Sequence, residues 1–349
     1  MKYAVWFVRL VYAAWMIPAG LNHFIQLYPQ PTGNQEMSIA VFTALIDSGL
    51  FTVVKAVELL AGIAVLIGFR LPLFLIMVLP VSFTVWYWDT ELQGWWTGSA
   101  VYGWSVLGCN LFLCLYYWPS YRAMFAADAQ PRAPIPALDI PKLYNGLRVL
   151  LGLVLALSAI RYFMPFLLAD YIPLPEFSDP MALRLRTVLD ASGLLAVAKF
   201  IHLIAGLMLL DRRFVPFALA ALMPVNLCAA FIALLEGTAP LVLAALVILA
   251  VNGLLMLAHL ASYRDVLSAG QVAEVETAEP GQNYESLFAN SLSGAPTRAY
   301  LGGAIVLALA LLFYWQVVPG LNGPTGLYTL ILPSVIFAAG LARAMVVKA

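Results

Sequence analysis

Two lysines, Lys55 and Lys199, stand inside long apolar segments of the chain, where a charged side chain is costly and commonly functional. The segments read VVKAVELLAGIAVLIGFRLPL and AVAKFIHLIAGLMLLDRRFVPF, and the two lysines match at an offset of 144 residues. Three residues after the lysine, the first segment has Glu58, close enough for an ion pair, and the second has His202. A lysine or histidine donor beside a proton-exchanging carboxylate is what quinone reduction requires, so Lys55 and Glu58 form a candidate ligand site. Lys199 and His202 form the equivalent candidate site of the second segment, with donors but without the carboxylate.

Other polar residues are expected at the same depth as each lysine, and a four-helix bundle would allow them to converge. The candidate ligand-binding residues are Asn22, His23, Lys55, Glu58 and Ser82 in the first copy, and Arg161, Lys199, His202 and Asn226 in the second. The second set contains no carboxylate. Lys199 is therefore balanced by Asp170 or Asp190 near the surface, or is neutral, or binds an anion or a carbonyl oxygen.

The same residues also have structural interpretations. The Lys55–Glu58 pair could serve only to hold helices in place, and Lys199 could extend toward the lipid headgroups. Four further residues in apolar segments are interpreted structurally: Asn110 and Asn252 as donors of interhelical hydrogen bonds, and Arg9 and Arg148 as reaching the cytoplasmic headgroups.

The composition indicates an all-α polytopic membrane protein. Of the 349 residues, 63% are hydrophobic and 10% are charged, against roughly 25% charged residues in soluble proteins. Long apolar runs predict ten transmembrane helices, at about 4–24, 51–69, 71–88, 99–119, 145–165, 194–211, 214–234, 239–261, 299–318 and 325–345. Shorter surface helices are predicted at 39–48 and 181–192. The zero net charge gives no basis for binding nucleic acid, and the three cysteines show no metal-binding spacing.

The basic residues predict the orientation in the membrane. The loops 25–50, 89–98, 235–238 and 319–324 contain no lysine or arginine, whereas the loops on the other side are rich in them. The exceptions are Arg184 and Arg186, in the predicted surface helix of the second copy. The positive-inside rule therefore places both termini in the cytoplasm, which requires an even number of transmembrane helices.

The matching segments belong to a longer internal duplication. The predicted organisation is a first four-helix repeat at 1–125, a linker at 126–143, a second four-helix repeat at 144–268, a polar cytoplasmic linker at 269–297 and a transmembrane hairpin at 298–349. Because each repeat has an even number of helices, both copies should have the same orientation and be related by an axis along the membrane normal.

The first repeat resembles the DoxX-like membrane proteins. The resemblance is carried by RLVYAAWMIPAGLNHF, by KAVELLAGIAVLIGFRLPL and by YRAMF after the fourth helix, with Arg9, Gly20, Asn22, His23, Lys55, Glu58 and Gly62 at the motif positions. It covers about 1–125 well and 143–268 more loosely, departing at Arg161, Tyr162 and His202, and it does not cover 295–349. It implies a four-helix bundle in a bacterial inner membrane, and an association with quinol oxidation, thiosulfate:quinone oxidoreduction or the redox maturation of periplasmic enzymes.

Three functions are compatible with these observations. The first is an accessory or assembly subunit of a membrane or periplasmic redox system, which would dock its partner protein through the hairpin 298–349. The second is a redox subunit that binds a quinone or another lipophilic ligand through the Lys55/Glu58 and Lys199/His202 clusters, with electrons supplied by a partner. The third is a transporter of a small solute or of protons. The sequence leaves open whether the protein is an enzyme.

Overall fold

The computed structural model describes residues 2–131 and 141–267 of the chain. The predicted linker 269–297 and the predicted hairpin 298–349, with its helices at 299–318 and 325–345, lie outside the described residues. Part of the predicted linker 126–143 also lies outside them.

Eight helices of the described part are long and apolar enough to cross a membrane. They are α1 (Lys2–Ile25), α3 (Leu50–Ile67), α4 (Leu71–Thr90), α5 (Gly98–Tyr116), α7 (Pro141–Phe163), α10 (Leu194–Asp211), α11 (Val215–Glu236) and α12 (Ala239–Ala258). The described residues contain no β-strand. The sequence prediction of an all-α polytopic membrane protein is confirmed, and these eight helices occur where the first eight spans were predicted.

Shorter helices connect the long ones. Two of them, α2 (Glu36–Asp47) and α9 (Pro180–Ala191), precede the lysine helices α3 and α10 and occur at the predicted positions. Helix α9 begins where the side chain of Asp179 accepts hydrogen bonds from the first-turn amides of Met181 and Ala182, a typical N-cap. The remaining short helices are α6 (Trp118–Tyr121), α8 (Pro165–Leu168), the 3₁₀ helix η2 (Leu260–Tyr263) and α13 (Arg264–Leu267).

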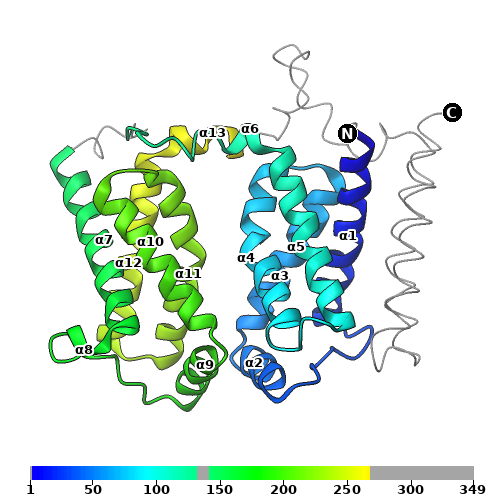
Figure 1. Ribbon diagram of the computed structural model, residues 1–349, viewed down its shortest axis with the longest axis horizontal. Helices are drawn as coiled ribbons and strands as arrows, with labels where there is room; N and C mark the ends of the chain where they lie inside the picture. The colour runs from blue at the N-terminus through cyan, green and yellow to red at the C-terminus, as the bar shows by residue number, and fades with distance from the viewer. Residues whose placement is uncertain (1, 132–140, 268–349) are drawn as a thin grey trace, which may run out of the picture. The chain divides into compact units, whose positions relative to one another are not determined.

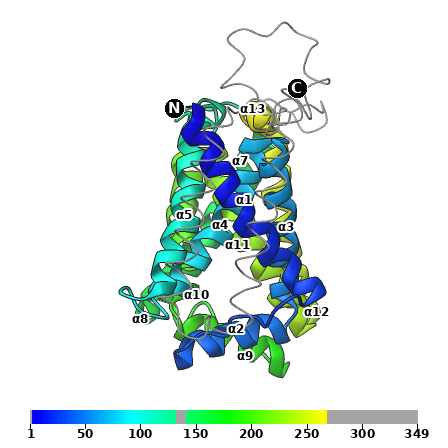
Figure 2. The ribbon, with the colours of Figure 1, turned by 90° about the vertical axis from the view of Figure 1, so that its right-hand side faces the viewer.

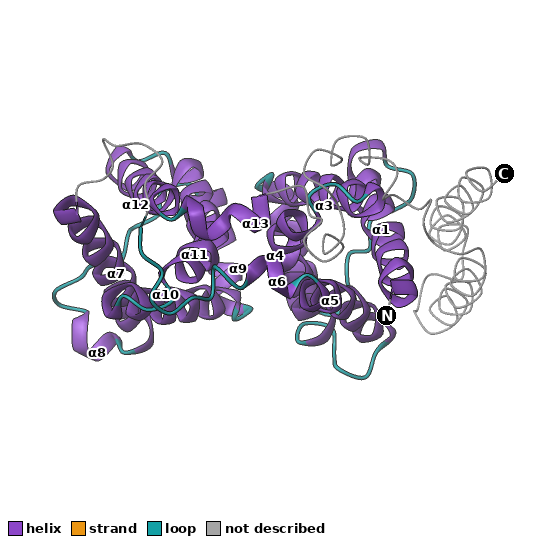
Figure 3. Cartoon of the chain, turned by 90° about the horizontal axis from the view of Figure 1, so that it is seen from above, coloured by secondary structure: helices purple, strands orange, loops and turns teal. Residues whose placement is uncertain are grey.

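The described residues form two compact units. The first unit comprises residues 2–39, 51–120 and 266–267, with the long helices α1, α3, α4 and α5, and α1 runs obliquely across it (Figures 1 and 2). The second unit comprises residues 40–50 and 121–265, with the long helices α7, α10, α11 and α12 (Figures 1 and 3). Residues 40–50 belong to the second unit because Ala44 and Leu50 pack with Leu185 of α9.

Matching positions of the two repeats have the same unusual backbone. Gly49 and Gly193, just before the lysine helices, have φ angles of 79° and 82°. In the turn after these helices, Arg70 and Phe214 both have positive φ, at 43° and 55°. Left-handed backbone is uncommon for residues other than glycine, so its recurrence at an offset of 144 residues shows that the repeated sequence folds into a repeated turn.

A glycine in each lysine helix allows a neighbouring helix to approach closely. Gly62 of α3 faces α1, where an added Cβ would lie 3.0 Å from side-chain atoms of Met16 and Ile17. Gly206 of α10 faces α7, where an added Cβ would lie 2.9 Å from the carbonyl oxygen of Gly152. Small residues permit such approaches between membrane helices, and here they hold each lysine helix against the first helix of its repeat.

Candidate functional site

In the first unit, the predicted ion pair between Lys55 and Glu58 forms. The Nζ atom of Lys55 lies 2.6 Å from Oε2 of Glu58, and the two side chains are 11% and 6% exposed. The ammonium group also lies 5.1 Å from the centre of the Phe51 ring, in cation–π geometry. The two side chains are thus largely buried, and each charge neutralises the other.

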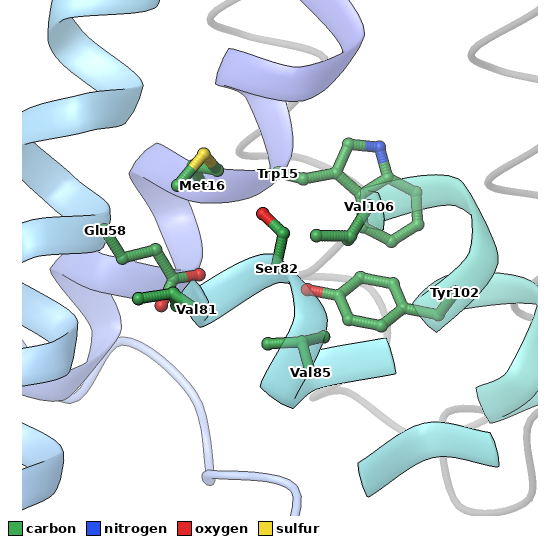
Figure 4. A pocket seen from close by; sticks show the side chains of 8 residues that line it. All are labelled: Trp15, Met16, Glu58, Val81, Ser82, Val85, Tyr102 and Val106. Atoms are coloured by element: carbon green, nitrogen blue, oxygen red, sulfur yellow. The ribbon is translucent and has the colours of Figure 1, made fainter. Parts of the chain in front are cut away.

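Glu58 lines a small pocket between the helices of the first unit (Figure 4). The other polar side chains of its wall are Ser82 and Tyr102, and the hydroxyl of Tyr102 points toward Ser82 (Figure 4). The rest of the wall is apolar or aromatic: Trp15, Met16, Val81, Val85 and Val106. The free volume is about 10 Å³, which suffices for about one water molecule but not for a quinone ring.

Ser82 joins a chain of hydrogen bonds that crosses the first unit. Its Oγ lies 2.6 Å from the hydroxyl of Tyr12 on α1. The amide nitrogen of Asn110 on α5 donates to the same hydroxyl over 2.7 Å, and to the main-chain carbonyl of Leu75 over 3.2 Å. Asn110 therefore donates interhelical hydrogen bonds, as predicted. Sequence reasoning missed Tyr12, although a tyrosine in the middle of an apolar segment was a detectable signal.

The two candidates at the end of α1 lie near the ion pair without contacting it directly. Nε2 of His23 lies 2.8 Å from the hydroxyl of Thr52, and its ring packs edge-on against Phe51, the ring that also faces Lys55. Asn22 is buried, and its Oδ1 accepts a hydrogen bond from the main-chain amide of Tyr28 over 2.8 Å. Burial, together with the negative charge of Glu58, raises the pKa of Tyr28 to about 12. Asn22 thus shapes the turn that brings Tyr28 close to Glu58.

In the second unit, Lys199 forms no ion pair with any of the described residues. Its Nζ donates to the hydroxyl of Ser158 on α7 over 2.6 Å, and among the described residues no carboxylate lies within 4.0 Å. Of the alternatives considered for Lys199, a direct ion pair with Asp170 or Asp190 does not form, and Asp190 is exposed and accepts a hydrogen bond from Tyr162. Arg161 donates to the main-chain carbonyl of Ile172, over 3.0 Å, and so holds the loop after α8.

Several buried polar side chains of the second unit have unpartnered atoms, and three of them, His202, Asn226 and Asn252, come from the segments that match the first unit. Among the described residues, the amide nitrogen of Asn226 and both polar side-chain atoms of Asn252 have no hydrogen-bond partner. The ring nitrogens of His202 make no hydrogen bond of standard geometry, although the side chain of Asn226 lies beside them. The three side chains are at most 7% exposed. Asn252 therefore does not donate the predicted interhelical hydrogen bond. Since most buried polar groups in folded proteins are hydrogen-bonded, these unpartnered atoms call for water or a ligand.

One substitution between the repeats explains why the two units differ. Asn252 and Asn226 occupy the positions of Asn110 and Ser82, the two residues that Tyr12 connects in the first unit. At the position of Tyr12, the second repeat has Leu151, which is buried in the apolar core of its unit. In the first unit the hydroxyl of Tyr12 thus joins Ser82 and Asn110, whereas in the second unit Leu151 offers no hydroxyl to join Asn226 and Asn252.

Comparisons with protein-family models, with curated proteins and with solved structures find no match for this chain.

Proposed function

We propose that this protein binds a lipophilic molecule carrying a carbonyl or acidic group in its second unit, and that it serves a redox system as an accessory subunit. The observation that supports this is the difference between two equivalent lysines. Lys55 has the carboxylate of Glu58 at 2.6 Å, whereas the hydrogen-bond partner of Lys199 within the described part of the chain is the neutral hydroxyl of Ser158. A cation in an apolar helix without a counter-charge is costly, and an anionic group or a carbonyl oxygen of a ligand would reduce that cost.

The neighbours of Lys199 favour the same class of ligand. His202 lies three residues further along α10, and Asn226 lies on α11. Together the three side chains offer an ammonium group, an amide donor and an imidazole that can donate or accept. A headgroup with one or two carbonyl or carboxylate oxygens would pair with these donors. Its apolar part would lie among the hydrocarbon side chains of α10, several of which are exposed, such as Phe200.

The redox assignment and the cellular location rest on sequence patterns. The resemblance of the first repeat to DoxX-like proteins favours a bacterial inner membrane and a quinone as the ligand. The positive-inside rule places both termini in the cytoplasm and the ligand site in the outer half of the membrane. In this role Lys199 and His202 would hold a carbonyl oxygen, and a partner protein in the membrane or the periplasm would exchange electrons with the ligand.

The test compares the ligand content of three preparations in mild detergent. The wild-type protein, Lys199→Met and the double variant Lys55→Met/Glu58→Leu are extracted with solvent, and the retained small molecules are identified by mass spectrometry. We expect one lipophilic carbonyl or acidic compound in the wild type, its loss in Lys199→Met, and its retention in the double variant. A short-chain benzoquinone is then titrated into each preparation.

Two outcomes would contradict the binding site. One is equal retention by the wild type and a folded Lys199→Met variant, which would show that Lys199 does not hold the ligand. The other is the absence of any retained compound and of benzoquinone binding in all three preparations. That result would leave an accessory role without a ligand, to be sought through co-purifying proteins.

A further inference from the structure

The small pocket of the first unit is lined by several polar side chains. Glu58, Ser82 and Tyr102 contribute oxygen atoms to the wall of a space that fits about one water molecule (Figure 4). Cavities that stay empty in proteins are lined by apolar groups, whereas a water molecule is held where two to four polar partners converge. The wall of this pocket meets the second condition.

The directions of the neighbouring hydrogen bonds follow from the chemistry of Asn110. Its amide nitrogen can only donate, and it is identified by its bond to the carbonyl of Leu75, which can only accept. Asn110 therefore donates to the hydroxyl of Tyr12. The other hydrogen-bond partner of Tyr12 among the described residues is Ser82, so the hydroxyl hydrogen of Tyr12 goes to Oγ of Ser82.

This direction leaves a donor and an acceptor at the pocket. Ser82 accepts from Tyr12, so its own hydroxyl hydrogen needs another acceptor, and no described protein group provides one. Glu58 uses Oε2 for Lys55, and its second oxygen, Oε1, has no hydrogen-bond partner in the described part of the chain. Both side chains line the same small space.

We propose that the pocket binds one water molecule, which accepts the hydrogen of Ser82 and donates a hydrogen to Oε1 of Glu58. The water would join the Lys55–Glu58 pair on α3 to the chain of Ser82, Tyr12 and Asn110 on α4, α1 and α5. All four long helices of the first unit are then tied by one continuous hydrogen-bond network. This site is independent of the ligand proposed for the second unit.

A double-mutant cycle tests whether Ser82 and Glu58 are connected. Ser82→Ala, Glu58→Leu and the double variant are compared with the wild type by thermal unfolding in detergent, since leucine removes the acceptor oxygen. We expect the Tm loss of the double variant to be smaller than the sum of the single losses by about 2–4 °C, since the bridging water is lost only once. Additive losses would overturn the proposal. Thr84→Ala is the matched control, because Thr84 is on the same helix but donates to the carbonyl of Pro80, and it should be additive with Glu58→Leu.

A high-resolution map of the wild-type protein tests the same proposal without any variant. We expect a density peak within hydrogen-bonding distance of both Oγ of Ser82 and the carboxylate of Glu58. An empty pocket, in a map that shows other ordered water molecules, would overturn the proposal. A direct hydrogen bond between Ser82 and Glu58 would overturn it as well.

Discussion

Arg9 donates through Nε and Nη2 to the main-chain carbonyl oxygen of Val65, over 3.2 and 3.0 Å. Val65 lies in the last turn of α3, where carbonyl groups have no partner within the helix. The preceding carbonyl, of Ala64, accepts from the amides of Gly68 and Phe69, so Val65 needs a donor from elsewhere. A positive charge at this end of a helix is also favourable for the helix dipole. Arg9 on α1 therefore caps the C-terminus of α3.

The second repeat uses the same device. Arg148 on α7 donates to the carbonyls of Leu209 and Leu210 in the last turn of α10. Leu209 matches Val65 at the repeat offset of 144 residues. The prediction that both arginines reach lipid headgroups is wrong, because Arg9 and Arg148 are only 5% and 4% exposed. The C-terminal ends of α3 and α10 lie beside Arg9 and Arg148. The carbonyl groups there, which have no partner within the helix, accept hydrogen bonds from the two guanidinium groups.

Replacing either arginine by methionine should destabilise the protein. Arg9→Met and Arg148→Met each remove charged donors from buried carbonyl groups, and we expect each to lower the free energy of unfolding by roughly 1.5–3 kcal/mol. The measurement is denaturant-induced unfolding in mixed micelles, followed by circular dichroism. Arg122→Met, which changes an exposed arginine, is the control and should have little effect. Equal losses in all three variants would show that the buried arginines do not act as caps.

The ion pair of the first unit predicts that replacing one of its residues destabilises the protein far more than replacing both. Glu58→Ala leaves Lys55 as an uncompensated buried charge, so we expect a loss of about 3–5 kcal/mol in the free energy of unfolding. Lys55→Met/Glu58→Leu removes both charges and should come close to the wild type. Both are measured by the same unfolding assay. If the double variant is as unstable as Glu58→Ala, the pair contributes something other than mutual neutralisation.

The close approach of α10 to α7 can be tested at Gly206. A Cβ at this position would lie 2.9 Å from the carbonyl oxygen of Gly152 and 3.0 Å from the amide nitrogen of Ala156, and main-chain atoms cannot move aside easily. We expect Gly206→Ala to cost about 1–3 kcal/mol of stability. Gly253→Ala is the control, because a Cβ on Gly253 of α12 meets no atom within 4 Å. There the better helix propensity of alanine should leave stability equal or higher.

His259, just after α12, predicts a dependence of stability on pH. The ring is fully buried, its Nε2 lies 2.7 Å from the hydroxyl of Tyr144, and burial lowers the pKa of His259 from 6.5 to about 4. Between these values the unfolded chain binds more protons than the folded one, so stability falls as the pH decreases through this window. At pH 4 the loss from this residue should reach about 3 kcal/mol.

The measurement is the unfolding free energy of the wild type and of His259→Asn at several pH values between about 4 and 7. The variant should lose part of the pH dependence. His23→Asn is the matched control, because His23 is only partly buried and bonds to Thr52 at the end of α1, far along the chain from His259. An unchanged pH dependence in His259→Asn would assign the effect to other groups.

The amino-acid sequence by itself determined the features that depend on neighbouring residues. Apolar runs of sufficient length predicted the eight long helices of the described part, because hydrogen bonds within a helix satisfy the backbone in a lipid environment. The three-residue spacing of Lys55 and Glu58 predicted their ion pair, since a helix brings such positions onto one face. The repeated pattern placed the candidate residues of both units at equivalent positions.

Only the tertiary structure decided which partners these side chains meet across helices. Lys199 bonds to Ser158 and not to an aspartate, Arg9 meets the end of α3, and Tyr12 connects Ser82 with Asn110. Each of these contacts depends on the rotation and depth of one helix against another. Hydropathy predicts that a helix lies in the membrane, but close packing at residues such as Gly62 and Gly206 sets how far it is rotated.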